Sequence, residues 1–208
     1  MVQHLLLMTI APPLIWLGQP ARLVMHGLPE RFVNAVNPVF GWPSVRKLGR
    51  TLLRPMFCLV AASAVLVGWH IPTLFALGMR SATWHGVEQA SFLATGLLFW
   101  WPVVQPWPST PRRDLFMVLY LFFATLPCDI LSGFLVFCDR VVYPMYLSSS
   151  LAFGLSAFED QQCAGALMWT CVTVVYLVAG AILTMQSLSP QTQSAGEFQQ
   201  PKLHAPTA

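Results

Sequence analysis

The stretch Leu115–Cys138 reads LFMVLYLFFATLPCDILSGFLVFC, and Asp129 is its one charged residue. A helix needs about 20 mostly apolar residues to cross the hydrocarbon core of a bilayer, so this stretch is predicted to be a transmembrane helix. On either side of this stretch, the sequence contains further apolar segments of similar character. The predicted spans are residues 1–17, 55–77, 82–104, 115–138 and 163–185.

The composition of the whole chain supports this prediction. Hydrophobic residues make up 56% of the 208 residues and charged residues only 9%, whereas about 25% of the residues in a soluble domain are charged. A disordered chain needs the opposite composition, and a net charge of +3 is too small to indicate a nucleic-acid binder. The predicted fold is therefore an all-α integral membrane protein, a polytopic bundle of about five transmembrane helices.

The sequence predicts one domain and a tail. Residues 1–186 are expected to form a single transmembrane helical domain. Residues 187–208 are polar, rich in Gln, Pro, Ser and Thr, and predicted to be disordered. The first span is short and begins almost at Met1, with Pro12 and Pro13 inside it. We therefore expect a longer form of the protein to carry one or more helices before residue 1.

Basic residues in the loops predict the orientation, because cytoplasmic loops are enriched in Lys and Arg. Nine Lys and Arg residues lie in the loop after the first span, the loop after the third span and the tail, whereas the other two loops hold only Arg80 and Arg140. This bias predicts an N-terminus outside the membrane and a C-terminus in the cytoplasm.

Ionisable side chains inside a bilayer are costly and usually mark function. With the predicted orientation, all such groups lie in the outer half of the bundle, and they are three histidines and three carboxylates: His4, His70, His85, Glu88, Asp129 and Asp160. This asymmetry predicts a polar site near the outer surface.

Two short patterns indicate metal-binding chemistry. His4 precedes Met8 by one helical turn, and imidazole with thioether suits copper, although a methionine in an apolar helix more often serves packing. His85, Glu88 and Gln89 share one helix face, where the carboxylate can orient a ligating ring. The alternative for this second group is a polar cap of its helix at the membrane interface.

The sequence around His70 leaves two interpretations open. His70 is expected about 12 Å below the outer end of its span, because helices rise 1.5 Å per residue. Pro72 cannot donate a hydrogen bond to the Gly68 carbonyl, so the helix is expected to open beside the imidazole. The opened turn forms either a ligand site or a kink in which the histidine bonds a freed carbonyl. Asp160 similarly caps the last span or also supports the site.

Several stretches in order resemble the CtaG family of bacterial cytochrome c oxidase assembly factors, the multi-spanning kind found with caa-type oxidases. They are Gln3–Met8, Ala11–Pro13, Trp69–Pro72, His85–Phe92, Phe99–Pro102, Tyr143–Tyr146 and Glu159–Gln162 with Gly165, Met168 and Trp169. The family usually has a second histidine where this chain has Gln89, and it usually has helices before the first histidine motif.

The resemblance implies a plasma-membrane protein that matures the oxidase by supplying or inserting copper into subunit II on the outer side. Its implied partners are oxidase subunits, subunit II above all, together with the lipid bilayer, and it is not expected to be an enzyme. Joined to the patterns above, the resemblance predicts metal ligands at His4, His70, His85 and Met8, supported by Glu88, Gln89 and Asp160.

Two other hypotheses remain open. In a haem-binding membrane redox protein, His70 and His85 would be the axial ligands, although their expected depths differ by several ångströms. In a metal-free scaffold, the chain would bind oxidase subunits and no ion. The sequence contains no phosphate loop, metalloprotease motif or nucleophile elbow that would favour a hydrolase or an ATPase.

Overall fold

The computed structural model describes residues 2–19, 27, 42–105, 115–148 and 154–188, and within these residues it contains helices and no strand. The elements are α1 (Val2–Leu5), the π-helix η1 (Leu6–Ile10), α2 (Ala11–Leu17), α5 (Pro43–Leu52), α6 (Pro55–Trp69), α7 (Pro72–Arg80), α8 (Ala82–Val104), α9 (Leu115–Phe137), the 3-10 helix η2 (Pro144–Ser148) and α10 (Ala157–Leu188).

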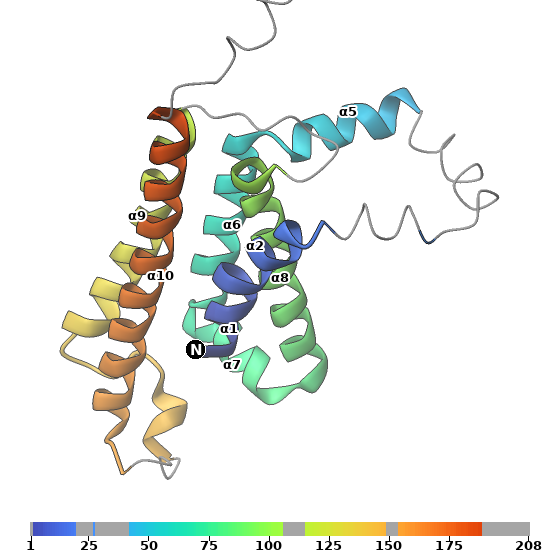
Figure 1. Cartoon of the computed structure of the whole chain (residues 1–208). Helices are drawn as coiled ribbons and strands as arrows, with labels where there is room; N and C mark the ends of the chain where they lie inside the picture. Colours follow the sequence, from blue (N-terminus) through green and yellow to red (C-terminus); the bar gives the residue numbers. More distant parts are fainter. Residues whose placement is uncertain (1, 20–26, 28–41, 106–114, 149–153, 189–208) are drawn as a thin grey trace, which may run out of the picture.

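The long helices form a bundle with two distinct ends (Figure 1). Helices α6 and α9 run toward the end that holds the N-terminus and α7, whereas α8 and α10 run away from it. We call this the histidine end, because His4, His70 and His85 belong to it. The opposite end, called the basic end, carries α5 with Arg46, Lys47 and Arg50.

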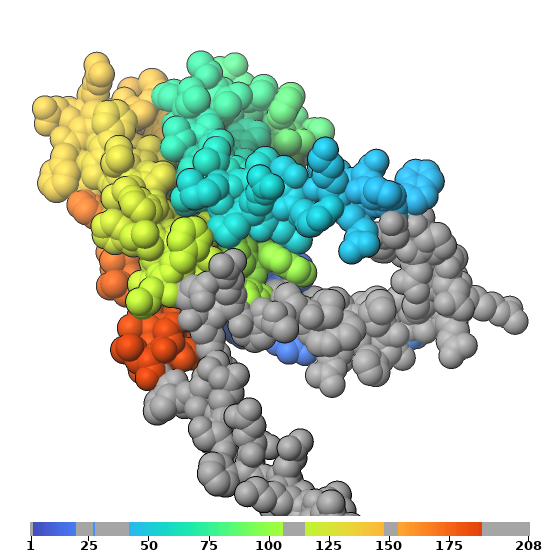
Figure 2. Space-filling model, turned by 90° about the horizontal axis from the view of Figure 1, so that it is seen from above, coloured from blue at the N-terminus to red at the C-terminus, as the bar shows by residue number. Residues whose placement is uncertain are grey.

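Only part of the predicted set of spans meets the length and hydropathy of a membrane helix. Among the described residues, α9 and α10 do so, and α5 with α6 makes a third candidate if that pair, bent by 65°, is one span. Seen from the basic end, α5 projects sideways from the bundle (Figure 2). The structure is thus an all-α arrangement with apolar spans, while the count of five remains a prediction.

Predicted and observed helix bounds agree closely for α8 and α9. Helix α10 begins at Ala157 rather than at residue 163 because a capping box precedes it. The Ser156 backbone N–H and hydroxyl donate to Glu159 Oε2, each at 2.8 Å, and the Glu159 N–H donates to the Ser156 hydroxyl at 3.2 Å. Asp160 lies in the same first turn. Helix α10 ends at Leu188, and the rest of the predicted tail lies outside the described residues.

The predicted span over residues 55–77 is wrong as a continuous helix. It is two helices, α6 and α7, that meet at His70 and Ile71, where Pro72 starts the second helix. The Gly68 carbonyl is not left open, because the Ile71 N–H donates to it at 3.1 Å. His70 therefore lies at the C-terminal end of α6 and not inside a continuous helix, while its depth in the membrane stays a prediction.

Prolines also shape the N-terminal segment, which is helical from Val2 to Leu17. Pro12 has no N–H, so the Met8 carbonyl loses its usual partner four residues on. The Trp100 indole of α8 donates to that carbonyl instead, at 3.2 Å. Trp16 donates in the same way to the Leu97 carbonyl at 2.8 Å. Two indoles therefore fix this segment on α8, and they place His4 near the start of that helix.

Gly96 is the point of closest approach between α8 and the N-terminal segment. A Cβ there would lie 2.8 Å from Pro12 Cγ and 3.0 Å from the Met8 carbonyl oxygen. We expect Gly96→Ala to destabilise the protein by about 1–3 kcal/mol, because backbone atoms cannot move aside cheaply. Thermal unfolding in detergent measures this effect.

Gly86→Ala is the matched control on the same helix, because its Cβ would meet nothing within 4 Å among the described residues. It should leave stability unchanged or raise it, since alanine favours helix. Equal melting temperatures for the two variants would contradict the tight contact at Gly96.

Candidate metal site

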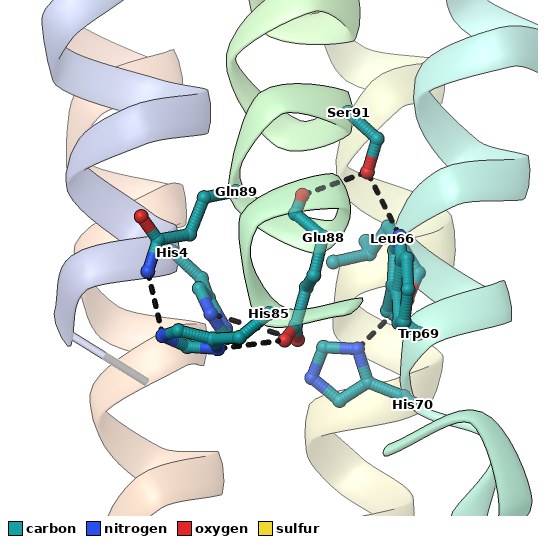
Figure 3. A network of polar contacts seen from close by, with 8 residues as sticks. All are labelled: His4, Leu66, Trp69, His70, His85, Glu88, Gln89 and Ser91. Carbon is teal, nitrogen blue, oxygen red and sulfur yellow. Dashed lines mark hydrogen bonds and ion pairs between the residues drawn. The ribbon is translucent and has the colours of Figure 1, made fainter. Parts of the chain in front are cut away.

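Three side chains that could hold a metal ion converge at the histidine end of the bundle (Figure 3). His4 comes from α1, and His85 and Glu88 come from the first turns of α8. One ligand atom from each lies within 4.8 Å of the others. We call these residues the histidine–glutamate cluster.

Glu88 is the centre of this cluster. Its side chain is buried, with the residue only 4% exposed. Oε1 lies 3.5 Å from His4 Nε2, and Oε2 lies 3.2 Å from His85 Nδ1. A buried carboxylate is costly unless it is paired, so the two imidazoles stabilise it. Glu88 was predicted as a supporting residue, yet its position also allows it to be a ligand.

Both ring nitrogens of His85 have a polar neighbour. Nδ1 faces Glu88, and Nε2 lies 2.6 Å from Gln89 Nε2 one turn further along α8. When the Gln89 amide donates to Nε2, His85 carries its proton on Nδ1 and donates it to the carboxylate. That is the carboxylate–histidine pair seen behind many metal ligands, with Nε2 available to an ion once Gln89 moves away.

Aromatic and hydroxyl groups hold the cluster in place. The Phe92 ring stacks on the His4 ring with centroids 4.8 Å apart. The Ser91 hydroxyl donates to the Glu88 carbonyl at 2.7 Å and accepts the Trp69 indole N–H at 2.8 Å. The cluster is therefore tied to α6 as well as to its own helices.

His70 occupies a different position, next to the cluster. At the end of α6 the His70 N–H donates to the Val67 carbonyl, three residues back, and not to the Leu66 carbonyl, four residues back. The His70 ring bonds the Leu66 carbonyl instead, with Nδ1 2.7 Å from the carbonyl oxygen. The Tyr143 hydroxyl donates to the His70 carbonyl at 3.0 Å. Of the two open interpretations, the kink with a bonded carbonyl is present, and it does not occupy Nε2.

The predicted site residues thus divide into three groups. The structure brings His4, His85, Glu88 and Gln89 together. His70 and Met8 share an adjoining cavity of about 40 Å³ that His4 also lines. Asp160 lines a separate pocket with Tyr146 and Gln161.

Gln161, beside Asp160, has a structural role that fits this separation. Its Oε1 accepts the Val142 N–H at 2.7 Å, and its amide donates to the Leu135 carbonyl at 3.2 Å. These bonds fasten the segment after α9 to the start of α10. The stretch Glu159–Gln162 therefore anchors a loop in addition to beginning a helix.

Two lining residues of the cavity were missed at the level of the sequence. Cys128 of α9 and Met168 of α10 both face it. Met168 belongs to a stretch that carries the family resemblance, which was a usable signal. Cys128 follows Pro127 inside a span, and nothing in its local pattern distinguishes it from the other cysteines in apolar runs.

The donor set of the cluster suits a borderline metal ion. Two imidazoles and one carboxylate are typical ligands of copper and zinc, whereas magnesium and calcium prefer oxygen donors alone. Three protein donors leave a coordination position open, which a site needs if it is to exchange its ion with a partner.

Sequence comparisons give the context for this site. Uncharacterized protein Mb0105 of Mycobacterium bovis and uncharacterized protein MT0111 of Mycobacterium tuberculosis are each 26% identical to the chain over 192 residues. The match covers 88% of this chain but only 29% of either relative, so the chain spans less than a third of their length. No solved structure matches the chain. The model of the cytochrome c oxidase caa3 assembly factor family, Caa3_CtaG, matches residues 1–189, and the chain therefore belongs to this family.

Proposed function

We propose that this protein acts in the assembly of cytochrome c oxidase by carrying copper and passing it to subunit II. The observation that carries the proposal is the convergence of His4, His85 and Glu88 within 4.8 Å in a chain of this family. Copper is the cargo, and the protein neither oxidises it nor catalyses a reaction. His70 and Met8 complete the proposed ligand set from the adjoining cavity.

A copper carrier has to bind the ion and also release it. The cluster offers three donors and no closed cage, so a partner side chain can enter the open position before the ion leaves. Gln89 supports exchange from the other side, because its amide contacts His85 Nε2 and can return when the ion departs. Incomplete coordination therefore favours transfer over storage.

The proposal requires the histidine end to face outward from the bacterial plasma membrane. The charges of the described residues support this, because Arg46, Lys47 and Arg50 gather on α5 at the opposite end. Cytoplasmic ends of membrane proteins carry such an excess of basic residues.

Cysteine labelling tests this orientation. In a cysteine-free background, a membrane-impermeant maleimide should label Asp139→Cys in intact spheroplasts and Lys47→Cys only after lysis. Both positions are exposed, and they belong to the histidine end and the basic end, respectively. The reverse pattern would place the cluster in the cytoplasm and contradict delivery on the outer side.

The function itself is tested by the copper content of the oxidase. In a strain that carries only the His85→Ala protein, we expect oxidase with its haem largely retained and its subunit II copper depleted under limiting copper. The proposed defect concerns metal supply, so haem insertion should continue. His204→Ala, another histidine of the same chain, is the matched control and should leave the copper content normal.

Other results would point to different functions. Full copper loading with His85→Ala present at normal abundance would contradict the carrier. Loss of oxidase subunits with normal copper in the remaining enzyme would favour a metal-free scaffold. Visible haem bands in the purified chain would favour the haem-binding alternative.

A further inference from the structure

A cavity between the helices of the bundle adjoins the histidine–glutamate cluster. It has a volume of about 40 Å³, well above the ~10–15 Å³ that one water molecule needs. Its lining includes His70, Met8, Cys128 and Met168, which come from α6, η1, α9 and α10. We call these residues the sulfur cavity, because three of the four carry sulfur.

His70 supplies the first reason to regard this cavity as a binding site. The residue is 7% exposed, and its Nδ1 donates to the Leu66 carbonyl. That bond leaves Nε2 as a bare lone pair, and this atom is buried without a hydrogen-bond partner among the described residues. A buried hydrogen-bond acceptor without a partner is costly. An imidazole lone pair donates readily to a metal ion, so a bound ion would supply the missing partner.

The sulfur residues supply the second reason. Met168 and Cys128 are almost fully buried, at 2% and 3% exposure, so solvent does not compete for their sulfur atoms. Thioether and thiol sulfur are soft donors that select Cu(I) over harder ions. Methionine is also flexible enough to bring its sulfur to an ion without movement of the backbone.

Not every buried sulfur in this protein faces the cavity. Met117 is 2% exposed and Cys58 is 0% exposed, yet neither lines it. Met117 is a methionine buried in this core away from the cavity, and the Cys58 thiol donates to the Leu52 carbonyl at 3.1 Å instead of facing the cavity. They also provide controls that are matched in residue type and in burial.

We propose that the sulfur cavity is a Cu(I) site, held by His70 Nε2 and the sulfur atoms of Met8, Met168 and Cys128, and that His4 connects it to the cluster. This inference rests on the proposed copper function. It adds a second binding site for the ion and specifies its oxidation state. His4 both lines the cavity and lies 3.5 Å from the Glu88 carboxylate. The ion passes between the sulfur cavity and the cluster by ligand exchange at His4. It remains Cu(I), so no electron is transferred.

The charges support the choice of a monovalent ion. His70, Met8 and Met168 are neutral donors, whereas Cys128 binds as a thiolate after its proton is released to solvent, so the cavity supplies one negative charge. One thiolate balances the charge of a monovalent ion, whereas a divalent ion would keep a net positive charge that is costly to bury. The cavity is therefore suited to Cu(I) and poorly suited to Zn²⁺ or Cu(II).

The test uses the full chain purified in detergent without oxygen and titrated with Cu(I) against a chromophoric Cu(I) chelator. X-ray absorption of the loaded wild type should show sulfur in the copper shell. Met168→Leu and Cys128→Ala should each weaken Cu(I) binding by about tenfold or more, on the scale of losses seen when metal sites are disturbed. Met117→Leu and Cys58→Ala should leave the affinity unchanged.

The outcomes separate this proposal from the copper function as a whole. A wild-type copper shell with nitrogen and oxygen alone overturns the sulfur cavity, as do equal affinities for Met168→Leu and Met117→Leu. In both cases copper still binds, and the carrier function stands on the cluster. If the wild type binds neither Cu(I) nor Cu(II), both proposals fall. The absorption measurement needs no variant, so a variant that fails to fold does not remove the test.

Discussion

Glu88→Gln is expected to lower the copper affinity of the histidine–glutamate cluster by about 10- to 100-fold, the usual cost of removing a group that orients metal ligands. The carboxylate contacts both imidazoles, at 3.5 Å from His4 and 3.2 Å from His85. Glutamine has the same size as glutamate but no negative charge. It therefore holds the two imidazole rings less strongly in the orientation that the carboxylate gives them. Competition titration of the purified protein with a chelator measures the change.

Glu159→Gln is the matched control for this experiment. Glu159 caps α10 through Ser156 and does not contact the cluster. Its substitution should leave copper affinity at the wild-type value. Equal affinities for Glu88→Gln and the wild type would show that the carboxylate neither holds nor orients the ion.

Gly78→Ala is expected to displace the Glu88 carboxylate without changing Glu88 itself. A Cβ at this position of α7 would lie 2.8 Å from Glu88 Oε2, the oxygen that faces His85. Because Oε2 ends a side chain that can rotate, the fold should tolerate the change while the carboxylate moves. We therefore expect weaker copper binding with little change in thermal stability. Gly68→Ala, whose Cβ would meet nothing within 4 Å among the described residues, should change neither quantity.

His70→Ala is expected to damage copper handling more than Met8→Leu. His70 is the one nitrogen donor of the sulfur cavity outside the cluster, whereas Met8 shares its role with Met168 and Cys128. Loss of one of three sulfur donors should therefore lower the copper affinity less than loss of the one nitrogen donor. In cells, His70→Ala should give oxidase that lacks subunit II copper and keeps most of its haem. Added copper should restore part of the loss by mass action.

The measurement for His70 is oxidase activity and copper content in a strain that carries only the variant, grown with limiting copper. The abundance of the variant in membranes is the necessary control, because the Tyr143 bond to the His70 backbone also stabilises this region. A fully copper-loaded oxidase at normal variant abundance would remove His70 from the delivery path. Greater damage from Met8→Leu would contradict the ranking of the two ligands.

Local chemistry explains which features of this protein were predictable. The bounds of α9 follow from a long apolar run in which Asp129 is the one charged residue, and the break after α6 follows from the missing N–H of Pro72. The shared face of His85, Glu88 and Gln89 follows from the helical period. Each of these features depends on residues only a few positions apart, so the sequence contains all the information needed.

Features that join distant segments were not predictable in the same way. His4 meets Glu88 because the N-terminal segment packs closely on α8 at Gly96, where a side chain would clash with Pro12. Asp160 was grouped with the site because it is acidic and was expected on the outer side, yet it lies in another pocket. Shared depth in a membrane does not decide which helices are neighbours.

Sequence patterns were enough to predict a helical membrane protein with the histidines and carboxylates of its spans toward one end. Apolar length, proline positions and helical spacing act locally, and they are sufficient for those conclusions. The packing of the helices places Glu88 between two imidazoles, and it brings Cys128 and Met168 to the cavity beside His70. Contacts between residues far apart in the sequence, such as the Trp100 indole bond to the Met8 carbonyl, set how each helix is rotated and which helices are neighbours. The pattern of residues within one helix does not encode those contacts.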